Sequence, residues 1–262
     1  MHYHELLETL RKAFPQPVSD PVHDGYVVFV QGGFPGDVVV AEVTRAKRDY
    51  GNARVVDLIE PSNDRVAERC RHEGSGCPGS PWQALRYESQ LEHKQALVGD
   101  ALERLGKLPD HELEPIVPAT DVWRYRNKLE YSFGERDTSG DETALVLGFH
   151  ARGNWEQIED AHDCMLASER SNSVRNLVRD WCAAEGLSAY DRREATGFLR
   201  NLVVREGRHT GALQVRLVTS EGDFRAEEFA DVVRSAQPSA DVLWTRTSRP
   251  AEGAHGGSTS VL

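Results

Sequence analysis

Apolar and polar positions form two kinds of pattern along this chain, and the first of them predicts strands. Between Tyr26 and Ile59, short apolar runs are separated by turns that contain glycine and proline, such as Gly32–Gly36. These runs predict strands over residues 26–30, 38–44 and 54–59. Short strands with little helix between them are typical of a small β-barrel.

The second pattern places apolar residues three and four positions apart and predicts helices. The predicted helices cover residues 4–14, 90–108, 172–185 and 226–236. The apolar stripe of the helix over 90–108 is expected to be buried in a core, and it consists of Leu91, Val98, Leu102 and Leu105. Cys182 lies on the stripe of the helix over 172–185, so it is interpreted as a core thiol.

Alternation of apolar and polar residues predicts further strands in the second half of the chain. They cover residues 121–133, 144–149, 197–205, 211–218 and 242–247, and the closing run 253–260 is interpreted as a turn. Hairpins between these strands favour a mostly antiparallel sheet with helices interposed, so the fold class is α+β. The predicted domains are a small OB-like β-barrel in 1–62, a cysteine-rich loop and helix start in 63–95, and a central α+β domain in 96–262.

Composition narrows the function classes. The chain has 262 residues, a formal net charge of −11, a pI of about 5.4 and a mean hydropathy of −0.54. This acidic balance argues against a uniformly basic nucleic-acid surface. No apolar run approaches a membrane span, and the N-terminus lacks a signal-peptide pattern, so a cytoplasmic location without membrane contact is expected.

The positive charge is instead concentrated in local clusters that contain aromatic residues. One cluster lies on and between the predicted strands of the barrel and consists of Arg45, Lys47, Arg48, Tyr50 and Arg54. Another starts the central domain and consists of Trp123, Arg124, Tyr125, Arg126 and Lys128. Basic groups beside aromatic rings suit RNA phosphate contact and base stacking. The alternatives are a strand edge protected by charge, and a strand whose alternate residues face the core.

The loop cysteines Cys70 and Cys77 are candidate metal ligands. They are separated by six residues in a glycine- and proline-rich loop that ends where a helix begins. Thiolates on a loop that can fold tightly suit a metal ion or an iron–sulfur cluster, although C-x2-C pairs are the stronger signal. The alternative is two loop cysteines beside a helix start. In a reducing compartment the chain's cysteines favour ligands or core thiols over disulfides.

A longer pattern surrounds this loop and recurs downstream. It comprises Cys70, Cys77, Gly79, Trp82-Gln83, Leu85, Tyr87, Gln90-Leu91 and Lys94, then WRYRNK at 123–128, GFHARG at 148–153, EDAHDCML around Cys164, and LRNLVVR at 199–205. The pattern resembles the 23S rRNA (uracil-5-)-methyltransferase family. The segments DGYVVFVQGGFPGDVVVAEV and PSNDRV resemble the TRAM domain, an OB-like RNA-binding barrel that precedes the cysteines in that family.

This resemblance implies a 4Fe-4S cluster held by cysteines, with Cys164 as the downstream ligand. The family pattern is C-x5-C-G-G-C, whereas here the first linker is one residue longer and Ser80 stands where the third cysteine belongs. A serine oxygen is a harder ligand than a thiolate and holds iron poorly. The candidate ligand set is therefore Cys70, Cys77 and Cys164 with Ser80, and His72 or His162 is the alternative for the weak position.

In the family, an S-adenosylmethionine-binding methyltransferase domain follows the central domain, and no pattern of it occurs before Leu262. No catalytic residue is assigned, and the isolated chain is not expected to methylate RNA. The resemblance implies the RNA-recognition portion of a 23S rRNA uridine C5-methyltransferase, with S-adenosylmethionine entering only through the missing domain. Ribosomal RNA and a separately encoded methyltransferase domain are the expected partners. The alternative is a stand-alone, non-catalytic RNA-binding or metal-binding module.

Overall fold

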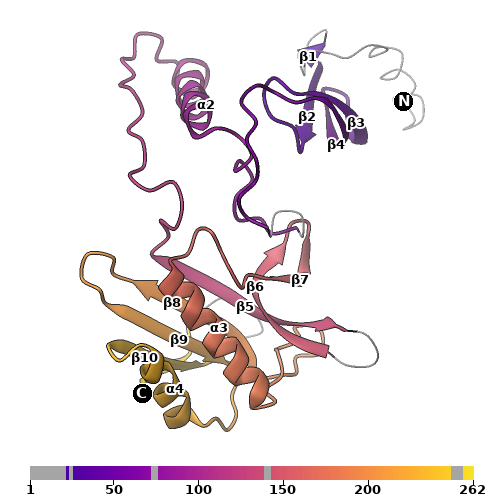
Figure 1. The fold of residues 1–262 in the computed structure, drawn as a ribbon. Coiled ribbons are helices and arrows are strands. Elements are labelled where there is room, and N and C mark those ends of the chain that lie inside the picture. The colour runs from indigo at the N-terminus through magenta and orange to yellow at the C-terminus, as the bar shows by residue number, and fades with distance from the viewer. Residues whose placement is uncertain (1–21, 24–25, 72–75, 139–142, 249–255) are drawn as a thin grey trace. The chain divides into compact units, whose positions relative to one another are not determined.

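A computed structural model describes residues 22–23, 26–71, 76–138, 143–248 and 256–262 (Figure 1). The helix predicted over 4–14 lies outside these residues. The described residues form two compact units: those up to Ala67 join Trp82–Ile116, and Glu68–Pro81 join Val117–Leu262. Within the described ranges, no helix is both long enough and apolar enough to span a membrane.

The first unit contains a four-stranded sheet. Its strands are β1 (Val22–His23), β2 (Tyr26–Gln31), β3 (Val38–Ala46) and β4 (Tyr50–Glu60). The spatial order is β1-β2-β4-β3, with β4 parallel to β2 and antiparallel to β3. The predicted strands are confirmed, although β4 begins four residues earlier than predicted because it continues the hairpin from β3. Closure of this sheet into a barrel stays a prediction.

The turn between β2 and β3 is held by a buried carboxylate. Gly36 has a φ of 86°, and a Cβ there would come within 2.9 Å of the Ser62 hydroxyl, so only glycine fits without strain. Asp37 accepts hydrogen bonds from the amides of Phe34 and Ser62 at 2.6 and 2.9 Å. Arg65 donates to both of its oxygens at 2.7 Å. One carboxylate therefore joins this turn to the segment that follows β4.

The helix of the first unit differs from its prediction. Helix α2 spans Tyr87–Asp100 and continues as a π-helical turn, η2, over Ala101–Leu105. The prediction that its apolar stripe is buried in a core is wrong, because Val98 is 49% exposed and Leu105 is 83% exposed. The described residues of α2 bury only Ser89. Amphipathic spacing predicts which face of a helix is apolar, but only tertiary packing decides whether another element covers that face.

The second unit is built on a seven-stranded sheet (Figure 1). Its spatial order is β11-β10-β9-β8-β5-β6-β7, and within the described part of this sheet only β9 and β10 pair in parallel. The bounds are β5 (Lys128–Asp137), β6 (Thr143–Ala151), β7 (Asn154–Asp160), β8 (Leu199–Glu206), β9 (Leu213–Thr219), β10 (Ala240–Arg246) and β11 (Ser258–Val261). The predicted mostly antiparallel sheet is confirmed.

Three segments of this sheet differ from the predictions. Strand β7 was not predicted. Residues 121–127 do not extend β5, because the amides of Arg124 and Arg126 donate to the carbonyls of Met165 and Leu166 instead. The end of the chain was expected to be a turn, but β11 pairs antiparallel with β10. Its short polar sequence carries no alternation of apolar residues, so its strand character comes from this partner.

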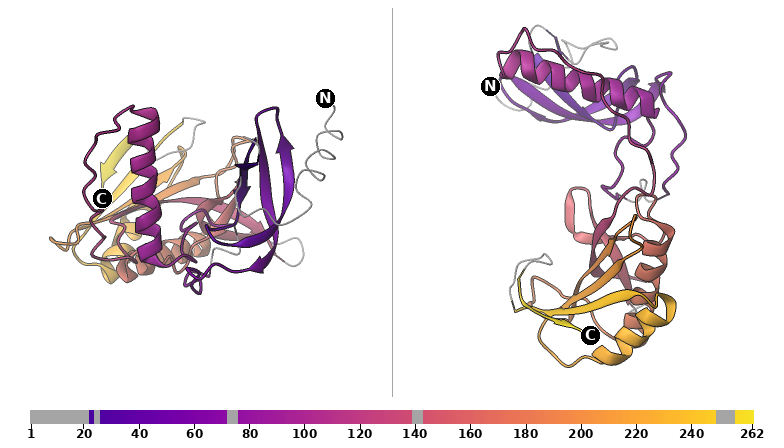
Figure 2. Two further views of the ribbon diagram at one scale, coloured as in Figure 1. Left: turned by 90° about the horizontal axis from the view of Figure 1, so that it is seen from above. Right: turned by 90° about the vertical axis from the view of Figure 1, so that its left-hand side faces the viewer.

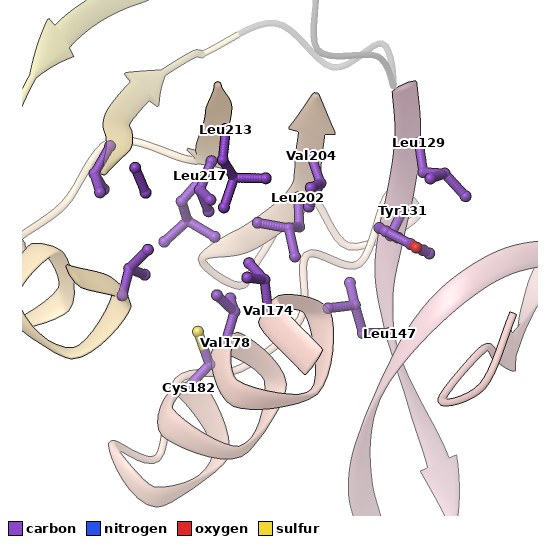
Figure 3. Packing of buried hydrophobic residues seen from close by; sticks show 14 of the residues in the cluster. Leu129, Tyr131, Leu147, Val174, Val178, Cys182, Leu202, Val204, Leu213 and Leu217 are labelled. Atoms are coloured by element: carbon purple, nitrogen blue, oxygen red, sulfur yellow. The ribbon is translucent and has the colours of Figure 1, made fainter. Parts of the chain in front are cut away.

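Helices α3 (Glu169–Ala184) and α4 (Ala226–Ala236) lie on the same side of the sheet (Figure 2). The Ser168 hydroxyl caps α3 by accepting from the amide of Ser171 at 2.9 Å. Figure 3 shows the α3 residues Val174 and Val178 facing apolar side chains of the strands. Cys182 is fully buried in this cluster, as predicted, and burial raises the pKa of its thiol to about 12.

Candidate functional site

The solvent face of the first sheet displays an aromatic pair. The pairing of Phe29 with Asn52, and of Val27 with Tyr50, places Phe29 and Tyr50 on one face of neighbouring strands. Their ring centroids are 5.8 Å apart with an interplanar angle of 77°. Phe29 is 59% exposed, which is unusual for so large an apolar ring. Sequence reasoning missed Phe29 because it treated Tyr26–Val30 as one apolar run; the polar Gln31 on the same face was the available signal.

Three cations lie beside this pair at one end of the sheet. Arg45 lies opposite Asn52 near the end of β3, and Lys47 and Arg48 form the exposed turn into β4. The Lys47 ammonium lies 5.1 Å from the centroid of the Tyr50 ring. A hydrogen bond with Lys47 lowers the pKa of Tyr50 below its ordinary value. The three cations predicted to bind RNA on this domain are therefore close in space.

Arg54, which was grouped with these cations in the sequence, has a different environment. Its guanidinium donates to Glu42 at 2.9 and 2.7 Å across β3 and β4. Both side chains are more than half exposed, so this ion pair contributes little to stability. Arg54 is thus engaged with a carboxylate on its own sheet.

The second basic cluster is largely engaged within its own unit. Arg124 has a φ of 53°, uncommon for a residue other than glycine. Its guanidinium donates to the carbonyl of Ala167 at 3.0 Å and lies 3.5 Å from Asp163 and 3.8 Å from Glu169. These contacts hold the loop before α3, so RNA contact by Arg124 stays a prediction and competes with a structural role.

The other members of that cluster also contact different parts of their own unit. The Arg69 guanidinium lies 5.5 Å from the centroid of the Trp123 ring, and Trp123 packs against the core. Lys128 pairs with Glu130 at 3.2 Å. Arg126 is half-buried beside the segment 165–167. The cluster therefore does not present a single row of unengaged cations, and RNA contact by Trp123, Arg126 and Lys128 stays a prediction.

The predicted cysteine ligands lie in one unit, and α3 holds the downstream one. Cys164 is buried, and its amide and carbonyl form hydrogen bonds with the side chain of Asn172, each at 3.1 Å. One turn further along α3, Asn176 donates to the carbonyl of His162 at 3.0 Å. Arg175, between them, pairs with Asp160. Polar residues on α3 thus hold the segment that carries Cys164 through hydrogen bonds and an ion pair. The sequence pattern did not reveal this feature.

Of the two loop cysteines, Cys70 lies near enough to Cys164 to affect the pKa of its thiol. Burial raises the pKa of Cys164; the amides of Leu166 and Ala167 oppose this shift, and the neighbouring Cys70 adds to it. Cys70 and Cys77 are half-buried, as is Ser80. Among the described residues, no three His, Cys, Asp or Glu side chains form a group that could hold a metal ion. Ligation of an iron–sulfur cluster by Cys70, Cys77, Cys164 and Ser80 therefore stays a prediction, and no function is derived from it.

The residue at position 80 gives a direct test of the cysteine hypothesis. Ser80→Cys is expected to slow the loss of brown absorbance and iron when protein purified without oxygen is exposed to air, because a thiolate holds iron better than a hydroxyl. Visible absorbance and iron content measure this loss. Ser235→Cys, at an exposed position of α4, controls for the added thiol. Equal iron retention in all three proteins would contradict the hypothesis.

Comparisons with known proteins first define the class of the small sheet. Residues 22–56 match the TRAM domain, and this range contains β2, β3 and most of β4 with the aromatic pair and its cations. The TRAM resemblance seen in the sequence is thereby confirmed.

The similarity extends beyond that domain to longer proteins. The chain is 37% identical over 208 residues to an uncharacterised RNA methyltransferase of Chlorobaculum tepidum, covering 75% of this chain and 43% of that protein. It is 36% identical over 196 residues to one of Halalkalibacterium halodurans, covering 75% and 41%. The chain therefore spans less than half the length of these relatives.

A solved structure shares the fold. The tRNA (uracil-54, C5)-methyltransferase of Pyrococcus abyssi, in complex with S-adenosyl-L-homocysteine, matches with a TM-score of 0.65 and 23% identity. The match covers 91% of this chain and 52% of that enzyme. At this identity the likeness establishes the fold alone.

Proposed function

We propose that this chain is the RNA-recognition portion of an S-adenosylmethionine-dependent RNA uridine C5-methyltransferase, which forms 5-methyluridine. The observation that carries the proposal is the TRAM sheet, on whose solvent face Phe29 and Tyr50 lie beside Arg45, Lys47 and Arg48. The similarity to proteins named RNA methyltransferases supports the same substrate class.

In this proposal, methyl transfer belongs to the part of the relatives that this sequence does not match, whether on the same polypeptide or a separately encoded one. S-adenosylmethionine would bind there, in line with the S-adenosyl-L-homocysteine bound to the enzyme of similar fold. The residues of this chain would bind and orient the RNA.

The RNA class is the finer part of the proposal. The sequence pattern resembles 23S rRNA enzymes, whereas the solved enzyme of similar fold is named for a tRNA uridine. We propose 23S rRNA, because the cysteine-loop and WRYRNK patterns support it. Binding of the chain to an unmodified 23S rRNA fragment and to unmodified tRNA, measured side by side, distinguishes the two.

Replacing Arg45, Lys47 and Arg48 together by glutamine tests the RNA surface. The slope of log K against log salt is negative, and each lost phosphate contact reduces its magnitude by about 0.7 for single-stranded RNA. The triple change is therefore expected to reduce that magnitude by roughly 2. Fluorescence anisotropy over a salt series measures this slope.

A matched triple change controls for net charge. Arg104, Arg193 and Arg208 are exposed cations that each pair with a carboxylate elsewhere in the chain, and their replacement by glutamine removes the same charge. An equal drop in slope from both triple variants would show a general charge effect and contradict the proposed surface. Replacing Arg124, Arg126 and Lys128 together by glutamine measures the contribution of the second cluster to RNA binding in the same assay.

A further inference from the structure

We infer that Phe29 and Tyr50 form a stacking platform for an unpaired nucleobase, so the TRAM sheet selects single-stranded RNA over duplex RNA. This inference rests on the proposed function and specifies how its RNA surface recognises its ligand. The two rings lie on adjacent strands of the solvent face, with Phe29 more than half exposed.

The geometry of the pair leaves ring surface available. The rings meet nearly edge to face at 77°. In such an arrangement, the ring that supplies its edge keeps both of its own faces away from the partner ring. An extruded base can stack on such a face, and base–aromatic stacking tolerates any sequence because every base has a π-face.

Neighbouring residues suit the rest of a nucleotide. Arg45, Lys47 and Arg48 lie at one end of the platform and provide cations for the phosphates on either side of a stacked base. Two carboxylates occur nearby: Glu42 is paired with Arg54, and Asp49 lies exposed in the turn. Cations therefore outnumber unpaired carboxylates around the rings, as a polyanionic ligand requires.

The aromatic pair separates single strands from duplexes for a physical reason. In a duplex the base faces are already stacked on one another, and only the phosphates and groove edges are accessible. Cations alone bind both forms, whereas an exposed ring gains stacking energy only from an unpaired base. A surface for phosphates alone would need no exposed phenylalanine beside its cations.

The test uses the full chain and two fluorescent RNAs of equal length, a single strand with one 2-aminopurine and a fully paired, blunt-ended duplex. Phe29→Ala is expected to weaken single-strand binding roughly 5- to 150-fold, the range that corresponds to loss of one base–aromatic stack. Duplex affinity and the salt slope should not change, because no charge is removed. The 2-aminopurine quenching seen on binding to the parent protein should be lost, and Phe29→Tyr should restore it.

Val30→Ala is the matched control, because Val30 is the next residue of β2 and points to the opposite face. It should leave both affinities unchanged. Equal weakening of single strand and duplex by Phe29→Ala would overturn the inference. So would an unchanged affinity of Phe29→Ala while the Arg45, Lys47 and Arg48 variant still loses binding, and this second outcome leaves the proposed function intact. Failure of the parent chain to bind either RNA would overturn both.

Discussion

Replacing Arg175 by leucine is expected to lower the free energy of unfolding of the second unit by about 3–5 kcal/mol. Arg175 is fully buried on α3. Its guanidinium pairs with Asp160, donates to the carbonyl of Leu147, and donates to Asn176 Oδ1 at 2.7 Å. Burial lowers the pKa of Arg175 to about 10, so the side chain is still charged at neutral pH. Its removal leaves the Asp160 carboxylate without its partner cation.

Urea unfolding followed by tryptophan fluorescence measures this loss, since Trp181 and Trp244 lie in the same unit. The additional change Asp160→Asn should recover part of it, because the uncompensated charge is removed while an oxygen can still accept from the amide of Leu147. Arg193→Leu is the control: its ion pair with Glu156 is exposed and should be worth less than about 1 kcal/mol. Equal effects of Arg175→Leu and Arg193→Leu would contradict the prediction.

The Arg175 variant also has a local readout. Arg175 lies between Asn172 and Asn176, which hold the backbone on either side of Asp163. Loosening of this segment should expose Cys164, so its reaction with a thiol reagent should become faster, while the reaction of Cys182 follows only the global loss of stability. Mass spectrometry of the labelled protein separates the two cysteines.

Replacing Asp37 by alanine is expected to lower the stability of the TRAM sheet by about 3 kcal/mol. The carboxylate is almost fully buried, with 1% of its side chain exposed, and it accepts hydrogen bonds from Arg65 and two amides. Hydrogen bonds to a charged group are worth about 1.5–3 kcal/mol each, and loss of the carboxylate leaves these donors unsatisfied. Thermal unfolding followed by circular dichroism measures the change. Glu42→Ala, which breaks the exposed pair with Arg54, should cost less than about 1 kcal/mol.

The contribution of Asp37 should depend on pH in a defined direction. Burial opposes ionisation, but the hydrogen bonds from Arg65, Ser62 and Phe34 outweigh it and hold the pKa of Asp37 below its ordinary value of 3.8. A lowered carboxyl pKa adds stability above the unfolded-state pKa, and this stability is lost as the pH falls through the lower, folded-state pKa. The stability difference between parent and Asp37→Asn should therefore be constant at neutral pH and shrink below about pH 4. A difference at pH 2 as large as that at neutral pH would contradict this role.

Much of the secondary structure was predictable from local patterns. The period-two alternation of Leu213, Val215 and Leu217 predicted β9, and the stripe containing Val174 and Val178 predicted α3 and its buried face. These predictions succeeded because the elements pack against each other in one core, where the apolar period and the buried period coincide. The same rule failed for Leu105, whose side chain is not covered by another element of the described structure.

The candidate sites were likewise predictable only in part from the sequence. Residue type and order identified the cations at 45, 47 and 48 and the cysteines at 70, 77 and 164, because charge and thiol chemistry are properties of single residues. Tertiary structure alone decided that Phe29 meets Tyr50 across two strands that are separated in the sequence. It also decided that Arg124 is engaged with Asp163 and Ala167 instead of lying free on a surface.

The sequence by itself thus determined most of the elements, the local basic clusters and the resemblance to a TRAM domain, all of which depend on neighbours close in the chain. Only the tertiary structure decided which side chains are exposed together and which are used internally. The physical reason is that burial and pairing depend on contacts between distant segments, such as Asn172 with Cys164 or Asp37 with Arg65. A residue's chemistry is local, but its availability to a ligand depends on the whole fold.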